Sequence, residues 1–190
     1  MNRRDSLKSL VFGSIGVGVL LEGCVSGVDN ETVANSLKKF NYGRTPKEKE
    51  YDKLLFSKKC FTNNQMTLIS KISNLILPPN EFGSINDAEV PELIEFMAKD
   101  IPSYETPLKE GLVALNQNSN EKFKKVFIDC DESQQKSILD LMAYPDPDLS
   151  SSEQSEEVKW FSLFRNLTMT GYYTSKVGIE ELGYKGNTPN

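Results

Sequence analysis

Apolar side chains recur at steps of three and four residues along most of the chain, which is the spacing that lines one face of an α-helix. The plainest example begins behind Thr62, a favourable N-cap residue, and ends at Pro78 and Pro79, which interrupt helices. Its apolar positions are Met66, Ile69, Ile72, Leu75 and Ile76. No segment shows sustained alternation of apolar and polar residues, so we predict an all-α fold.

The same spacing predicts several further helices. Pro46 and Pro91 mark first turns, and Asp131 is followed by Gln134 at the position of a capping box. The predicted segments are 47–58, 62–77, 90–101, 108–115, a short one at 123–128, 131–142 and 153–173. We therefore expect a compact bundle of about five to seven helices.

The last predicted helix, residues 153–173, is apolar on more than one face. A helix of this kind is covered on several sides by other polypeptide. It is either the central helix of the bundle or part of a protein interface, and we favour the central position.

The first 24 residues have the pattern of an export signal. Arg3 and Arg4 precede the uncharged run 10–21, which is too short to span a bilayer comfortably. The segment resembles a twin-arginine motif at Arg3, Arg4, Leu7 and Lys8, although Ser6 replaces the usual phenylalanine. An ordinary secretory signal is the alternative, and we favour the twin-arginine assignment.

The export signal ends in Leu21-Glu22-Gly23-Cys24, which resembles a lipoprotein processing site with an unusual Glu22. Acyl chains on Cys24 would hold the protein at a membrane surface; cleavage nearby without acylation would free it. Residues 25–46 are polar and are expected to form a tether with at most a short helix, and residues 47–190 to form the helical domain.

Composition excludes several classes of function. The chain has no histidine, which removes the usual general base, the imidazole metal ligand and the proximal haem ligand. Its net charge of -5 does not favour nucleic acid. Aspartates and glutamates lack an accompanying metal or acid–base motif, so we interpret them as solvated faces. We expect neither a catalytic residue nor a cofactor or metal in this chain.

Cysteines and aromatic residues supply the remaining candidate sites. Cys60 and Cys130 form a disulfide or are two buried free thiols, and we favour the thiols. Aromatic side chains dominate protein interfaces when buried at their centre. The candidates for contact with a partner are Trp160, Tyr172, Tyr173 and Tyr184, and of the two adjacent tyrosines we expect at least one ring to lie outside the core.

Three blocks of sequence are similar to one known family. The blocks are 68–79, which ends in Asn-Leu-Ile-Leu-Pro-Pro; 87–94, Asp-Ala-Glu-Val-Pro-Glu-Leu-Ile; and 164–175, Phe-Arg-Asn-Leu-Thr-Met-Thr-Gly-Tyr-Tyr-Thr-Ser, followed by Gly178 and Glu-Leu-Gly-Tyr at 181–184. With the helices between them they cover most of residues 51–184. The chain thus resembles gluconate 2-dehydrogenase subunit 3, the small subunit of membrane-associated flavin dehydrogenases.

The resemblance implies a non-catalytic subunit whose signal carries a signal-less flavoprotein across the membrane and keeps it folded. The large partner would hold FAD and oxidise a sugar or sugar acid, and a cytochrome c subunit would often accept the electrons. The complex would lie on the periplasmic side, associated with the membrane. A free-standing lipoprotein with a binding or structural role is the alternative.

Overall fold

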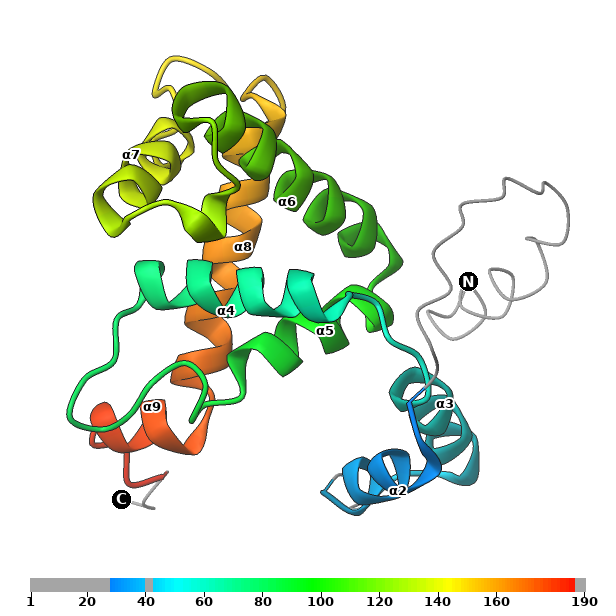
Figure 1. Ribbon diagram of the computed structural model, residues 1–190. Coiled ribbons are helices and arrows are strands. Elements are labelled where there is room, and N and C mark those ends of the chain that lie inside the picture. Colours follow the sequence, from blue (N-terminus) through cyan, green and yellow to red (C-terminus); the bar gives the residue numbers. More distant parts are fainter. Residues whose placement is uncertain (1–27, 40–42, 187–190) are drawn as a thin grey trace, which may run out of the picture.

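The computed structural model describes residues 28–39 and 43–186, and this part of the chain contains helices and no strand (Figure 1). The predicted all-α class is therefore confirmed. The helices are α2 (Asn30–Lys39), α3 (Pro46–Phe56), α4 (Asn63–Ile76), α5 (Val90–Asp100), α6 (Pro102–Phe123), the 3-10 helix η1 (Phe127–Asp129), α7 (Glu132–Ala143), α8 (Glu156–Tyr173) and α9 (Lys176–Glu181).

Local capping explains where several helices begin. Thr62 accepts a hydrogen bond from the Gln65 N–H, and the Gln65 side chain accepts one from the Thr62 N–H, which completes a capping box at α4. Asp131 and Gln134 form the same arrangement at α7. Both N-caps are the ones predicted from the sequence.

Helix α8 is the central element of the bundle, as we expected of a helix that is apolar on several faces. It contacts α4, α5, α6, α7 and α9, and Figure 1 shows it running through the molecule from the α6–α7 end to α9. Its buried side chains belong to the main hydrophobic core; they include Trp160, Phe161, Phe164, Leu167 and Tyr172.

The predicted short helix at 123–128 is wrong. Helix α6 is a single helix of 22 residues that ends when Lys124 adopts a left-handed conformation with φ 58°. Phe127 then enters the core, and its main chain is held by side chains: its N–H donates to Asn116 Oδ1, and its carbonyl accepts from Gln135 Nε2. These bonds fix a turn where the apolar pattern alone suggests another helix.

The two ends of the described chain carry helices that the sequence did not define. Helix α2 lies within the expected tether and contacts α3, and α9 is a short helix that follows α8. The candidate export signal, with Arg3, Arg4 and Cys24, lies outside the described residues. Among the helices of the described ranges, none combines the length and apolar character needed to cross a membrane.

Candidate partner interface

The four aromatic candidates for partner contact lie in different environments. Trp160 is 3% exposed and Tyr172 is 1% exposed, so both face the core of this subunit. Tyr173 is half-buried and packs against the edge of that core, with its ring perpendicular to that of Tyr172. Tyr184 is 55% exposed. Tyr184, and in part Tyr173, are therefore the candidates that reach the surface of the single chain.

A polar network fixes the C-terminal corner, where the loop after α4 meets the end of α8 and α9. The Tyr172 hydroxyl donates to Glu181 Oε2 at 2.6 Å, and Asn80 Nδ2 donates to the same oxygen at 2.9 Å. Burial and the hydrogen bond to the Glu181 carboxylate raise the pKa of Tyr172. The loop after α4 is thereby tied to the end of α8 and to α9, which lie far from it in the sequence.

The turn from α8 to α9 depends on Ser175 and Gly178. Ser175 Oγ donates to the Tyr172 carbonyl at 2.6 Å and accepts from the Gly178 N–H at 3.2 Å, which caps α9. A Cβ atom on Gly178 would lie 2.2 Å from the Tyr172 carbonyl oxygen. The third sequence block thus contains Tyr172, Ser175, Gly178 and Glu181 of this corner, and Asn80 joins it from the loop after α4.

Exposed apolar side chains surround the corner. Asn80 Oδ1 accepts from the N–H of Phe82 at 2.9 Å, and Gly83 lies against Val177 of α9, so the loop is held beside the helix (Figure 1). We call the exposed apolar side chains of this region the corner patch; they are Phe82, Ile179, Leu182 and Tyr184. Exposed apolar side chains gathered in one region are typical of protein interaction sites.

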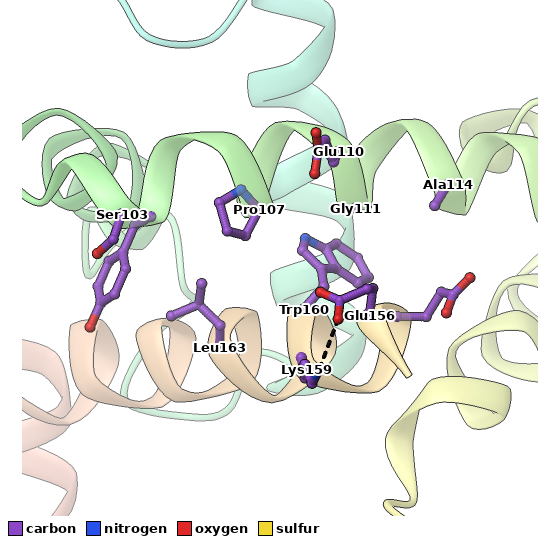
Figure 2. A pocket seen from close by; sticks show the side chains of 11 residues that line it. Ser103, Pro107, Glu110, Gly111, Ala114, Glu156, Lys159, Trp160 and Leu163 are labelled. Atoms are coloured by element: carbon purple, nitrogen blue, oxygen red, sulfur yellow. Dashed lines mark hydrogen bonds and ion pairs between the residues drawn. The ribbon is translucent and has the colours of Figure 1, made fainter. Parts of the chain in front are cut away.

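A separate groove lies between α6 and α8, with a volume of about 360 Å³ (Figure 2). A Cβ atom on Gly111 would lie 2.0 Å from Trp160 Cδ1, so this glycine allows the indole to pack directly against α6. The groove continues beside the indole over Pro107 and Leu163. Tyr104 also lines the groove. Its lining is thus mostly apolar and comes from two helices of the core.

The charged residues that line the groove come from both helices. Glu110 of α6 and Glu156 and Glu157 of α8 are acidic, and Lys159 is the one basic residue among those that line the groove. Lys159 Nζ pairs with Glu156 Oε1 at 2.8 Å (Figure 2). The carboxylates of Glu110 and Glu157 therefore have no cation within 4 Å among the residues that the structure describes.

Cys60 and Cys130 are both buried free thiols in this structure, so they do not form the disulfide that we considered. Burial raises the pKa of the Cys60 thiol to about 11, which keeps it protonated at neutral pH. Cys130 Sγ lies 3.1 Å from Ser119 Oγ. Within the described ranges, no group of three histidine, cysteine, aspartate or glutamate residues is placed to hold a metal ion.

Sequence reasoning missed two features of these surfaces. The closing block was recognised by the type and order of its residues, but the hydrogen bonds that Asn80 and Glu181 make in the corner were not predicted. The glutamate within that block was the available signal, since a charged residue in an apolar corner needs a partner. The contact between Gly111 and Trp160 joins residues 49 positions apart, and nothing in the local pattern indicates it.

Comparison with known proteins places the chain in a family. Residues 63–190 match the family model described as gluconate 2-dehydrogenase subunit 3, and this range holds helices α4 to α9 and all three sequence blocks. Neither a curated protein nor a solved structure is significantly similar to the chain. Because the match covers more than half of the sequence, the chain belongs to the gluconate 2-dehydrogenase subunit 3 family.

Proposed function

We propose that this protein is the non-catalytic small subunit of a flavin-dependent dehydrogenase complex, and that it binds and stabilises the large subunit. The large subunit holds FAD and oxidises a sugar or sugar acid of the gluconate type. A cytochrome c subunit is the further partner of such a complex. Membership of a family named for one subunit of a gluconate dehydrogenase is the observation that carries this proposal.

The corner patch supports the proposal from the side of structure. The corner is fixed by residues of the closing block. Tyr172 donates to Glu181, and Gly178 packs against the main chain of Tyr172. The apolar side chains that they position remain exposed, Leu182 at 61% and Tyr184 at 55%. A surface that is held firmly and is apolar suits a permanent contact with another subunit.

Export and membrane attachment complete the proposed role. The signal with Arg3 and Arg4 directs the folded pair of subunits through the twin-arginine route, so the large subunit needs no signal of its own. Cys24 is the candidate site of lipid attachment on the periplasmic side. This part of the proposal rests on the sequence of residues 1–24.

Co-purification tests the proposed binding. A tagged form of the chain, isolated from its native host, should retain a larger polypeptide that shows flavin absorbance and dehydrogenase activity. The tagged chain isolated alone should show neither. Failure to retain any flavoprotein, or dehydrogenase activity in the single chain, would contradict the proposal.

A pair of matched variants tests the corner patch itself. Leu182→Asp places a charge in the patch, and we expect it to reduce retention of the large subunit because desolvating that charge opposes docking. Leu54→Asp is the control, since Leu54 is 49% exposed on α3, outside the matched region. Equal retention by both variants would exclude the patch from the interface.

The escort role has a separate test. Replacing Arg3 and Arg4 by lysine should leave the dehydrogenase activity inside the cell, because the large subunit would lose the signal on which it depends. Normal export of the large subunit with this variant would contradict the escort role. It would not contradict the proposed binding between the two subunits.

A further inference from the structure

The groove between α6 and α8 has a feature that the subunit's own packing leaves unexplained. Trp160 Nε1 is a buried hydrogen-bond donor that has no acceptor in the part of the chain described. Buried indole N–H groups usually have a partner. Figure 2 shows the ring nitrogen on the edge of the indole that faces α6 beside Pro107. The unpaired donor therefore borders the apolar part of the groove.

A main-chain acceptor on the same side of the groove lacks its α-helical donor. Pro107 has no N–H, so the carbonyl of Ser103, four residues earlier in α6, cannot receive its α-helical hydrogen bond. Ser103 and Pro107 both line the groove. A polypeptide segment offers main-chain donors and acceptors side by side and so suits this combination.

The charged residues that line the groove specify the segment further. Lys159 is already paired with Glu156, while Glu110 and Glu157 have no ion pair within the described ranges. Both carboxylates are exposed, so they attract a cation without a large cost of desolvation. A segment that fits here carries an apolar side chain, which covers the apolar floor of the groove, and an arginine or lysine, which meets the carboxylates of Glu110 and Glu157.

We propose that the α6–α8 groove binds such a segment of the large dehydrogenase subunit, as a second contact distinct from the corner patch. This inference rests on the proposed function, because the occupant belongs to the partner named there. An apolar side chain covers Pro107 and Leu163, a basic side chain meets Glu110 and Glu157, and a main-chain carbonyl accepts from Trp160 Nε1. The nitrogen is enclosed in the single chain and lies against Gly111 of α6, so the indole and its neighbours must move on binding.

Charge changes at the rim test the basic part of the segment. In the complex of the full-length chains, Glu110→Lys combined with Glu157→Gln should weaken binding of the large subunit by about tenfold or more. A higher salt concentration should reduce the difference in affinity between this variant and the original chain. The control combines Glu121→Lys, at the far end of α6, with Glu132→Gln in the first turn of α7. Circular dichroism of both variants should match the original chain, which separates weakened binding from misfolding.

Trp160 provides a direct probe of the groove, because it is the only tryptophan of the chain. With ¹⁵N in the indole, the chain should give one indole N–H cross-peak, and this peak should move downfield when the unlabelled large subunit binds, as the donor gains an acceptor. An unchanged cross-peak in a complex that forms normally would overturn the groove assignment and leave the proposed function standing. Absence of any complex would overturn both. A shift on concentrating the chain alone would assign the groove to a second copy and would also overturn the inference.

Discussion

Two glycine contacts show how differently the two ends of α8 are built. Near its beginning, Gly111 of α6 meets the Trp160 side chain in the centre of the bundle; near its end, Gly178 of α9 meets the Tyr172 main chain at the C-terminal corner. The first contact joins two long helices of the core, and the second joins a helix of six residues to its neighbour. The contact of Gly111 should therefore govern the stability of the whole molecule. The contact of Gly178 should govern only the position of α9 and the corner patch.

The comparison extends to the surfaces themselves. At the corner, polar side chains are satisfied internally and the outward side chains are apolar. At the groove, the floor is apolar and the rim is acidic, and the Trp160 indole N–H finds no acceptor among the described residues. The corner thus suits a permanent apolar contact, whereas the groove suits a specific segment with a basic side chain.

The largest effect should come from Gly111→Ala. The added Cβ would overlap the indole ring, so α6 and α8 must separate, and we expect a loss of about 3 kcal/mol in the free energy of unfolding. Urea denaturation followed by circular dichroism measures it. In a Trp160→Leu background the same substitution should cost much less, and an undiminished cost would show that the indole contact is not responsible.

Gly178→Ala should have a smaller and more local effect. Its Cβ would meet a carbonyl oxygen of the main chain, so α9 should detach at a cost of about 2 kcal/mol. Hydrogen exchange should show lost protection in residues 172–184 and unchanged protection in α6. Loss of protection throughout the molecule would contradict the distinction between the two regions.

Tyr172→Phe removes one bond from the corner network and keeps the ring. The lost hydrogen bond to the Glu181 carboxylate should lower the free energy of unfolding by about 1–2 kcal/mol, since Asn80 still donates to that carboxylate. Equilibrium denaturation of the variant measures this. An effect as large as that of Gly111→Ala would mean that the corner is part of the cooperative core.

The smallest expected effect concerns the thiol of Cys60, and its measurement needs no substitution in the core. The pKa of this thiol is raised to about 11 in the folded protein, above the ordinary value of 9.0, so the protonated thiol favours folding. This contribution to the free energy of unfolding is complete below pH 9.0 and is lost as the pH rises through 11. Iodoacetamide at about pH 8 should therefore leave Cys60 unmodified in the native chain and modify it after denaturation, as mass spectrometry of its peptide would show. Rapid modification of the native thiol would contradict its burial.

The sequence predicted those parts of the fold that depend on local signals. Periodic apolar residues located α4, α7 and α8, and the pairs beginning at Thr62 and Asp131 located two helix starts. The turn after α6 could not be predicted from the apolar pattern, because Phe127 is fixed by hydrogen bonds to the side chains of Asn116 in α6 and Gln135 in α7. Helix α9 was missed because it is short and contains a glycine.

The burial of the candidate interface residues could not be predicted from the sequence, for a physical reason. Trp160 and Tyr172 are as suitable for a core as for an interface, and composition cannot decide between these environments. The surface side chains of the corner patch are ordinary apolar residues, and only the network of Asn80, Tyr172 and Glu181 shows that they are held together. Resemblance identified the family, while the structure was needed to locate surfaces.

Sedimentation of the chain in an extract of its native host, recorded through a fluorescent tag on the chain and through flavin absorbance, tests the central claim most directly. We expect the tagged chain to sediment with a larger species that carries flavin, and the same chain alone to sediment slowly with no flavin signal. A chain that remains monomeric in the extract, or that carries flavin by itself, would contradict the account.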